Sequence, residues 1–274
     1  LLGAALLYDG WQEPGMGTYE RVRWSLFHSV SAFCNAGFGL KSNNLMDYAG
    51  SPRMNLTVAG LIVLGGLGFG VILNMLHFRV GTLPALLRWK WIRKRAVEGD
   101  ISRLTVHSKV TLWMTGVLLL AGTAAFWALE AKGVLLGRPA GEQALASLFQ
   151  STSCRTAGFN TVDMDALRVP TLMVMTALMA VGASPGSTGG GVKTVGAAVL
   201  FATLVAMMRN REHVELHRRT IPRSNVNQAI TVVVLYLLAA FGFATILSLS
   251  DPDVPQHKLV FETVSAMSTV GLST

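Results

Sequence analysis

Four long stretches of the sequence contain almost no charged residues. They run from Met54 to Phe78, from Val110 to Leu129, from Val169 to Met208 and from Val226 to Ser250. A helix of about 20 apolar residues crosses the hydrocarbon layer of a membrane. The pattern therefore predicts four membrane-crossing segments. The third, in which Lys193 is the one charge, is too long for a single straight crossing, so we expect an interruption within it.

Positive charge gathers between these stretches. The chain has a net charge of +8 but only 14% charged residues, whereas a soluble domain has about a quarter. Residues 79–109 hold eight Lys or Arg and residues 209–223 hold five, and these two linkers carry a net charge of +9. Cytoplasmic loops of membrane proteins are enriched in this way, so we expect both linkers on the cytoplasmic side. A nucleic-acid-binding protein would instead carry a basic patch on a soluble domain.

Three short segments of the chain resemble one another. They are Ser31–Phe38 (segment A), Thr152–Phe159 (segment B) and Ser265–Leu272 (segment C), and their shared glycines are 121 and 113 residues apart. A period this long indicates duplicated subdomains with two crossings each. An apolar stretch too short to span a membrane precedes each segment: Tyr19 to Phe33, Glu142 to Cys154, and Gln256 to Met267. We expect re-entrant loops, because irregular backbone at membrane depth must be buried in protein or line a watery path.

The segments have the composition of an ion-selectivity filter. A cation that leaves water needs oxygen ligands in place of its hydration shell, and backbone carbonyls can supply them. Glycine adopts positive φ and lets the chain aim successive carbonyls at one axis. A turn between two helices is the alternative for any one copy, but three copies in register favour a pore loop. The expected ion-binding residues are Asn35, Ala36, Gly37, Thr156, Ala157, Gly158, Thr269, Val270 and Gly271.

Charged residues near the segments have a smaller part in this hypothesis. Each short helix would point its negative C-terminal end at the ion. Acidic residues at the outer face would concentrate cations there, although solvated loops often carry such residues by chance. We expect Arg155, inside segment B, to turn away and pair behind the filter. The acidic residues concerned are Asp47, Glu130, Asp163, Asp165, Asp251 and Asp253.

A glycine-rich run, residues 183–194, interrupts the third apolar stretch. Proline and glycine at this density break a helix. The run nearly matches a phosphate-binding loop, but Val192 separates Gly191 from Lys193 and no soluble strand precedes it. Two interpretations remain: a structural break, or a loop below the filter that obstructs the pore and moves aside, which its place within a pore-lining span favours. The expected gate residues are Ser184, Pro185, Gly186, Ser187, Thr188, Gly189, Gly190, Gly191 and Lys193.

Two further positions stay open. Lys193 could face the ion path or reach toward the cytoplasm. The five glycines of the first apolar stretch thin its helix, which favours close helix packing over a hinge. These glycines are Gly60, Gly65, Gly66, Gly68 and Gly70.

Together these motifs resemble the Trk, Ktr and HKT superfamily of potassium transporters, most closely its bacterial Ktr-type membrane subunit. The resemblance rests on segments A and C, on Phe149–Asp163 around segment B, and on Ala183–Thr194, and it covers nearly the whole chain. It implies an all-α integral membrane protein of repeated helix–pore loop–helix units around one pseudo-fourfold, potassium-channel-like pore. Segments A, B and C would be its second, third and fourth filters. Because the first filter and last inner helix lie outside the sequence, we expect a piece of a longer protein.

The resemblance also divides the chain and implies partners. We expect a second pore repeat at 1–78, a cytoplasmic linker at 79–109, a third repeat at 110–208, a second linker at 209–225 and a fourth repeat at 226–274. Such subunits look like multi-pass plasma-membrane homodimers resting on a cytoplasmic ring of nucleotide-binding regulatory subunits. The linkers would face that ring, and their composition fits anionic lipid equally well.

The sequence therefore predicts potassium uptake, passive or sodium-coupled, with no covalent cofactor. Glycine at all three filter positions looks potassium-like, and a sodium transporter of the same architecture is the alternative. A membrane-embedded enzyme would need acid, base or metal ligands that converge at membrane depth, and the sequence offers none: His77 stands near the end of a stretch and His28 precedes segment A. A receptor or scaffold without transport is a third possibility.

Overall fold

A computed structural model describes residues 1–82, 104–211, 213–216 and 219–274. The fold is helical, as predicted, apart from a small hairpin in which Glu215 pairs with Thr220. Much of the expected linker 79–109 lies outside the described residues. The elements are α1 (Leu2–Tyr8), α2 (Thr18–Phe33), the 3-10 turn η1 (Met46–Tyr48), α3 (Pro52–Leu67), α4 (Phe69–Thr82), α6 (Val106–Glu130), α7 (Ala140–Ser153), α8 (Val169–Ala180), α9 (Thr194–Met208), β1 (Glu215–Leu216), β2 (Arg219–Thr220), α10 (Arg223–Ser250) and α11 (Gln256–Met267).

Two helices of the described chain, α6 and α10, are long and apolar enough to cross a membrane. With 28 residues, α10 is about 42 Å long at 1.5 Å per residue. The bent pair α3 and α4 counts as a third span if it is taken as one, but its two parts are inclined at 96°. The first apolar stretch is therefore not the straight helix that its length suggests. The shorter apolar helices α8 and α9 flank the glycine-rich run, so the predicted interruption of the third stretch is confirmed.

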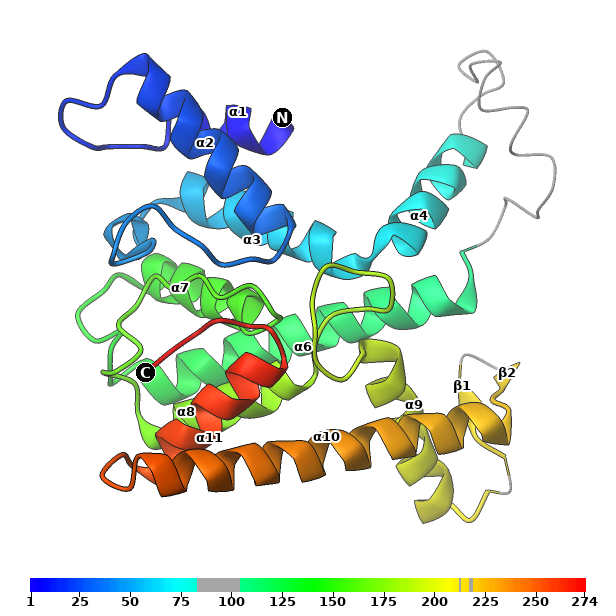
Figure 1. Cartoon of the computed structure of the whole chain (residues 1–274). Helices are drawn as coiled ribbons and strands as arrows, with labels where there is room; N and C mark the ends of the chain where they lie inside the picture. The colour runs from blue at the N-terminus through cyan, green and yellow to red at the C-terminus, as the bar shows by residue number, and fades with distance from the viewer. Residues whose placement is uncertain (83–103, 212, 217–218) are drawn as a thin grey trace.

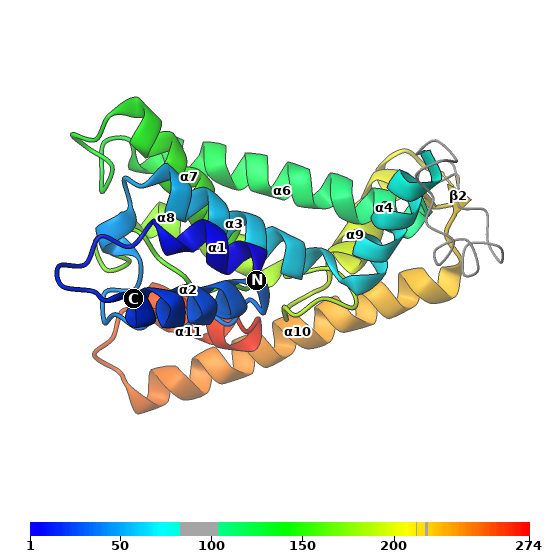
Figure 2. The same ribbon diagram turned by 90° about the horizontal axis from the view of Figure 1, so that it is seen from above.

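The three apolar stretches that were too short to span are helices α2, α7 and α11, as predicted. Helix α7 contacts α6, α2 contacts α3, and α11 contacts α10. Contacts also join the parts of the chain that carry different segments, since α3 packs on α7 and α8 packs on α11. Figures 1 and 2 show the resulting order around the molecule, from α1–α4 through α6–α9 to α10 and α11.

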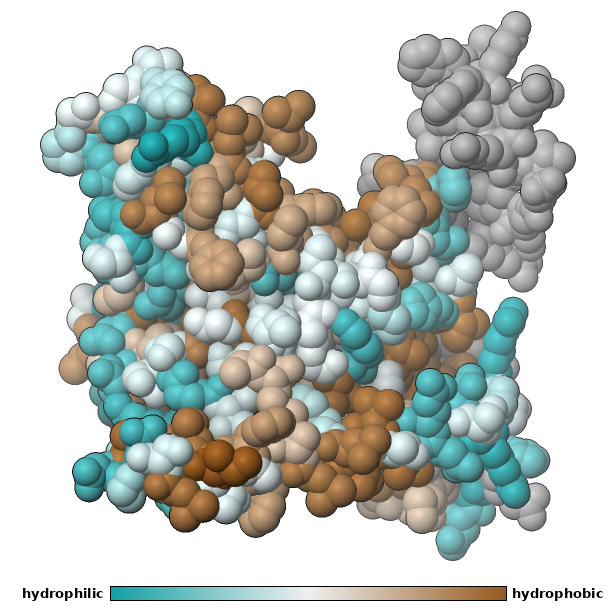
Figure 3. Space-filling model, in the orientation of Figure 1, coloured by the Kyte–Doolittle hydropathy of each residue, from teal (hydrophilic) through white to brown (hydrophobic). Residues whose placement is uncertain are grey.

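Polar connections lie at the two ends of this assembly. The loops that follow α6 and α10 lie at one end, and the end of α9, the β1–β2 hairpin and the start of α10 lie at the other (Figure 1). In the face drawn in Figure 3, hydrophilic residues gather at these ends and apolar residues lie between them. The polar ends and apolar middle are the arrangement that a protein in a bilayer needs.

Apolar side chains from distant parts of the chain share common cores. Phe149 of α7 and Phe159 of segment B are buried with Met54 and Ile62 of α3. Phe261 of α11 is buried among residues of α6 and α8, including Phe126 and Met175. Such close packing favours one arrangement of these helices, and it fixes the ends of α2, α7 and α11 relative to one another.

Candidate functional site

Segments A, B and C have the same unusual backbone conformation. Each segment has two residues with positive φ, a non-glycine residue and the glycine two positions later. The φ angles are 52° and 73° at Asn35 and Gly37, 70° and 79° at Thr156 and Gly158, and 55° and 88° at Thr269 and Gly271. A left-handed conformation disfavours a non-glycine residue by about 1–3 kcal/mol. The surrounding protein must therefore hold each segment in place, and it does so in the same way three times.

The three glycines meet at one place. A Cβ atom added to Gly37 would lie 2.4 Å from the carbonyl oxygen of Ala157 and 2.9 Å from the Cα atom of Gly158. A Cβ atom added to Gly158 would lie only 2.2 Å from the carbonyl oxygen of Val270. Glycine is required here for two reasons, since both the positive φ and the neighbouring backbone exclude a side chain. Segment A thus abuts segment B, and segment B abuts segment C.

Carbonyl oxygens of the segments are available to a ligand. Gly37 O accepts a 3.3 Å hydrogen bond from Asn44 Nδ2. Within the described part of the chain, the carbonyl oxygens of the other eight expected ion-binding residues accept no hydrogen bond from protein donors. Folded proteins satisfy most buried carbonyl groups, and oxygen atoms of this kind are the ligands that monovalent cations take up.

A short helix ends directly at each segment. The C-caps of α2, α7 and α11 are Cys34, Cys154 and Ser268, and the next residue begins the left-handed turn or directly precedes it. The negative ends of three helix dipoles therefore lie beside the glycines. A cation near a helix C-terminus is stabilised by about 0.3–1 kcal/mol at exposed sites, and this effect adds to that of the carbonyls.

A serine hydroxyl ties each turn back to its helix. Ser31 Oγ donates to Phe38 O at 2.9 Å and Ser265 Oγ donates to Leu272 O at 2.6 Å. In segment B the donor to Phe159 O is Ser153, one place later than the position that aligns with Ser31. These hydroxyls were not predicted, although a serine stands near the start of all three segments.

A side-chain contact joins segment A to segment B. In the amide orientation that gives both ends of Asn35 a partner, its nitrogen donates to Ile62 O and Ala32 O, each at 3.2 Å, and its oxygen accepts from Thr156 Oγ1 at 3.3 Å. With the amide reversed, its nitrogen lies 3.3 Å from the same hydroxyl. We prefer the first orientation because it satisfies every donor. Either way, Asn35 fastens the helix α3, its own segment and the next segment together.

The glycine-rich loop, residues 183–194, packs directly against segments B and C. The backbone N–H of Gly190 donates to Thr269 Oγ1 at 2.9 Å. A Cβ atom added to Gly189 would lie 1.9 Å from Thr156 Oγ1, so only glycine allows this approach. The hydroxyl of Thr188 reaches the carbonyl of Phe33, at the end of α2, at 3.5 Å. The loop therefore faces segments A, B and C close to their glycine turns.

The same loop is hydrogen-bonded to the bend between α3 and α4. The backbone N–H of Ser184 donates to Gly66 O at 3.0 Å, and that of Phe69 donates to Gly186 O at 3.1 Å. At the bend, Gly68 has φ +85° and its missing Cβ atom faces Pro185 O at 2.7 Å. Gly68 also ends α3, so close helix packing alone does not explain why glycine stands at this position.

Packing does explain another of these glycines. A Cβ atom added to Gly65 would lie 1.9 Å from the carbonyl oxygen of Phe33, whereas one added to Gly60 would meet no atom within 4 Å. Close packing therefore accounts for Gly65, and Gly68 combines close packing against Pro185 with the positive φ of the bend. The sequence gives no local sign of this difference, because it depends on which neighbour each glycine faces.

Two basic residues near the loop are held by backbone carbonyls. Lys193 Nζ donates to Gly189 O at 2.5 Å, which closes the loop on itself. Arg155 is 6% exposed, and its Nη1 atom is 3.5 Å from Thr115 O in α6. Arg155 thus points away from the glycines, as expected, but the group that it meets there is a backbone carbonyl.

The acidic residues of the outer end have structural partners. Glu130 is 0% exposed and accepts hydrogen bonds from Val134 N at 3.1 Å, Arg168 N at 3.0 Å and Thr171 Oγ1 at 2.5 Å. It joins the end of α6 to the start of α8 and is too deeply buried to attract cations at the surface. The expectation that Glu130 concentrates cations there is therefore wrong.

Two more of the acidic residues expected to attract cations, Asp47 and Asp165, are engaged by lysines. Lys41 Nζ lies 2.5 Å from both Asp47 Oδ2 and Glu13 Oε1, and Lys258 Nζ lies 2.5 Å from Asp165 Oδ1. The two lysines offset two of these three negative charges. They connect loops on the outer end to one another.

Comparison with known proteins decides the family. A family model described as TrkH, cation transport protein, matches residues 4–274. The chain belongs to the TrkH family of cation transport proteins. A crystal structure of the potassium transporter TrkH from Vibrio parahaemolyticus has the same fold, with a TM-score of 0.67 at 17% identity over 100% of this chain and 55% of that one. The helical membrane architecture is thus the fold of the TrkH family.

Several curated relatives are similar over nearly all of this TrkH-family chain. Ktr system potassium uptake protein B of Vibrio alginolyticus is 37% identical over 95% of the chain and 53% of its own length. The protein of that name in Bacillus subtilis is 33% identical over 98% of the chain and 56% of its own length. Potassium/sodium uptake protein NtpJ of Enterococcus hirae is 31% identical over 95% and 54%. The chain spans about half the length of these relatives.

Proposed function

We propose that the chain forms three sides of a potassium pathway in a plasma-membrane transporter of the TrkH family. The observation that carries the proposal is the meeting of Gly37, Gly158 and Gly271, each in a left-handed turn at the end of a short helix. The carbonyl oxygens of the nine residues of these turns would replace the water around the ion. These ligands are backbone carbonyl oxygens without any carboxylate. Such a site suits a monovalent ion, whose charge is too small to need carboxylate ligands.

Potassium is the ion that the relatives favour. Two proteins that are 37% and 33% identical to the chain are named potassium uptake proteins. Sodium remains the second candidate, because a relative at 31% identity is named a potassium/sodium uptake protein. Sodium, as a second permeant ion or a coupling ion, would use the same carbonyl oxygens, so the experiment below measures both ions.

The glycine-rich loop is proposed as the gate of this pathway. The expected gate residues are 184–191 and Lys193. Within this loop Gly190 is bonded to segment C and Thr188 to Phe33 of segment A, and two backbone hydrogen bonds join the loop to the α3–α4 bend. A loop held by single hydrogen bonds at separate points can move aside without unfolding the helices around it. Its contact with the bend at Gly68 offers a route by which movement of α4 could reach it.

The complete transporter is proposed to work with further subunits. The Ktr system relatives belong to named systems, which fits a homodimer that rests on a cytoplasmic ring of nucleotide-binding regulatory subunits. The basic segment after α9 lies at the same end as the start of α10 and would face such a ring (Figure 1).

Exchange of Gly158 tests the filter. In the full-length transporter, Gly158→Ser places a side chain against Val270 O in a left-handed residue, a strain of about 1–3 kcal/mol. We expect weaker discrimination of potassium from sodium, measured as uptake of each ion by potassium-deficient cells. Gly141→Ala is the matched control, because a Cβ atom there meets nothing within 4 Å. Unchanged uptake and selectivity in Gly158→Ser would refute the filter assignment.

Deletion of residues 184–191 tests the gate separately. The deletion removes Gly189 and Gly190, which face segments B and C, but leaves the turns themselves. We expect a higher basal potassium flux in membranes that contain the full-length variant. A properly inserted deletion variant whose basal flux equals that of the parent protein would refute the gate and leave the filter assignment standing.

A further inference from the structure

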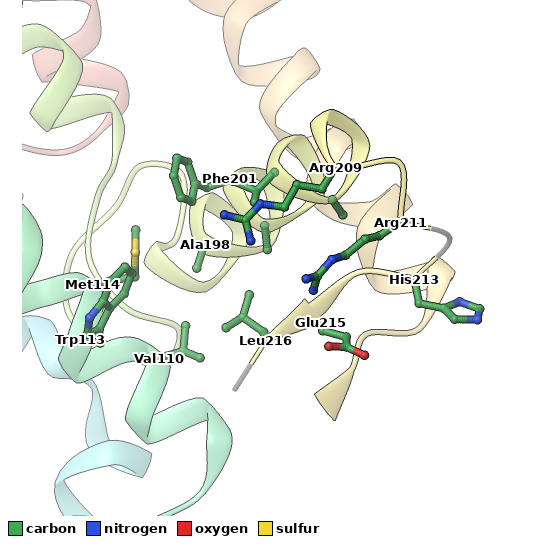
Figure 4. A pocket seen from close by; sticks show the side chains of 13 residues that line it. Val110, Trp113, Met114, Ala198, Phe201, Arg209, Arg211, His213, Glu215 and Leu216 are labelled. Carbon is green, nitrogen blue, oxygen red and sulfur yellow. The ribbon is translucent and has the colours of Figure 1, made fainter. Parts of the chain in front are cut away.

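A cavity of about 280 Å³ opens between α6 and α9 at the end of the molecule that carries the basic segments. Its walls are apolar: Trp113 and Met114 come from α6, Phe201 and Ala202 come from α9, and Leu216 comes from the hairpin (Figure 4). The lining residues of the cavity belong neither to segments A, B and C nor to the glycine-rich loop, so the transport pathway proposed above leaves the cavity without a role.

The rim of the cavity is positively charged. Arg209, at the end of α9, and Arg211 both direct their guanidinium groups toward the cavity, while His213 points away from it (Figure 4). One acidic residue, Glu215, also lies at the rim. Among the described residues, no carboxylate lies within 4.0 Å of either guanidinium group. Both groups are therefore available to an anion that approaches the rim.

We propose that this cavity binds an anionic phospholipid of the cytoplasmic leaflet. One acyl chain would lie between α6 and α9 against Trp113 and Phe201, and the phosphate would meet Arg209 and Arg211. The occupant needs an apolar tail and an anionic head, because the walls are apolar and the rim is cationic. Guanidinium groups bind phosphate through paired N–H donors, and basic pockets between membrane helices on the cytoplasmic side suit anionic headgroups.

The position of the cavity fits a lipid better than a soluble anion. Trp113 is 55% exposed, and tryptophan is enriched where the hydrocarbon layer meets the headgroups. An inorganic phosphate would use the two arginines and leave the apolar walls in contact with water. A zwitterionic lipid would bring its ammonium group to Glu215 but would lack the net negative charge that two guanidinium groups attract.

The binding experiment uses the purified full-length transporter and native mass spectrometry with phosphatidylglycerol or phosphatidylcholine. We expect phosphatidylglycerol to be retained in preference to phosphatidylcholine. In the double variant Arg209→Gln/Arg211→Gln, we expect its affinity to fall about tenfold or more, since each basic residue near the surface contributes to lipid attraction. The matched control is Arg219→Gln/Arg223→Gln, which removes two charges from the same end without altering the cavity lining.

A second variant tests the acyl chain. Ala202→Trp fills the apolar part of the cavity and keeps both arginines, and we expect it to reduce phosphatidylglycerol binding as strongly as the double variant. Equal losses in the double variant and its control would overturn the proposal, because only general charge attraction would remain. The melting temperature is also measured with inorganic phosphate and with phosphatidylglycerol. An equal rise with both ligands would show that the cavity is an anion site and not a lipid site. Loss of the oligomer in Ala202→Trp would show that the cavity belongs to a protein interface.

Discussion

The backbone N–H of Gly190 donates a 2.9 Å hydrogen bond to the side-chain oxygen of Thr269. This bond joins the glycine-rich loop to segment C. Thr269 is also one of the left-handed residues, with φ 55°, so one residue combines an unusual backbone conformation with the contact to the loop. The position of the loop and the shape of the turn are therefore linked.

Thr269→Val should release the loop. The exchange keeps the shape of the side chain but removes the acceptor of an exposed hydrogen bond, which is worth about 0.5–1.5 kcal/mol. We expect a basal rubidium influx that is higher by about twofold to tenfold in cells that make the full-length variant. Thr269→Ser keeps the hydroxyl and should behave as the parent protein does.

A second control separates the loop from general damage. Thr231→Val removes a hydroxyl that bonds only within α10, at 2.9 Å to Asn227 O, and should leave influx unchanged. If Thr269→Val has the same influx as Thr269→Ser, the bond from Gly190 does not hold the loop.

Local patterns were enough to predict the helices that end at the turns. The bounds expected for the short stretches, such as Gln256 to Met267, agree with the observed helices because an apolar run that ends at a glycine motif is a local feature. The break in the third stretch was also predictable, since Pro185 and the glycines around it disfavour helix directly. These elements depend on residues that are neighbours in the sequence.

Contacts between distant residues could not be predicted in this way. Gly68 and Gly186 are 118 residues apart and meet only because α3 packs beside the loop. Nothing in the sequence around Glu130 distinguishes it from a carboxylate on the surface. Its burial depends on contacts with Arg168 and Thr171, at the start of another helix. The left-handed turn at Asn35 was predictable from the sequence, because asparagine is enriched in this conformation.

Gly65→Ala should destabilise the packing of α3 against α2. The added Cβ atom would lie 1.9 Å from the carbonyl of Phe33, so the helices must separate, and overpacking of this kind is disfavoured by about 1–3 kcal/mol. We expect a lower melting temperature of the full-length transporter in detergent. Gly60→Ala, on the same helix but in open space, should instead stabilise by up to about 1 kcal/mol through helix propensity. Equal melting temperatures of the two variants would contradict the observed contact.

Glu130→Gln should loosen the junction of α6 and α8. The two oxygen atoms of Glu130 accept from Val134 N, Arg168 N and Thr171 Oγ1, and an amide nitrogen in place of either oxygen would face a donor. We expect a loss of about 1–3 kcal/mol in the free energy of unfolding and a lower melting temperature. Glu20→Gln changes an exposed carboxylate of α2 and should have little effect. A melting temperature of Glu130→Gln equal to that of Glu20→Gln would rule out this role.

The ion pairs of Lys41 should make stability depend on pH in acid. Hydrogen bonds from Lys41 and Tyr48 lower the pKa of Glu13 below its ordinary 4.5, and bonds from Lys41 and Asn43 lower the pKa of Asp47 below 3.8. The same carboxylates raise the pKa of Lys41 above 10.5. Burial, followed by the bond to Glu13, raises the pKa of Tyr48 to about 12, so its hydroxyl stays a donor throughout the range considered.

The sign of the effect follows from these directions. A carboxyl group with a lowered pKa contributes its stability above its unfolded pKa and loses it as the pH falls through the folded value. Lys41, whose pKa is raised, contributes below 10.5 and loses its contribution only in stronger base. We therefore expect the melting temperatures of the full-length protein and of Lys41→Met to differ by a constant amount from neutral pH down to about pH 5. They should converge as the pH falls below 4.5 and 3.8 and passes through the lowered pKa values of Glu13 and Asp47. Lys132→Met removes an exposed charge, and its melting temperature should differ from that of the parent protein by the same amount at every pH.

Because the ion pairs of Lys41 are partly exposed, high salt should also reduce the difference in melting temperature between the parent protein and Lys41→Met. A difference that grows in acid would show that these ion pairs do not stabilise the outer loops.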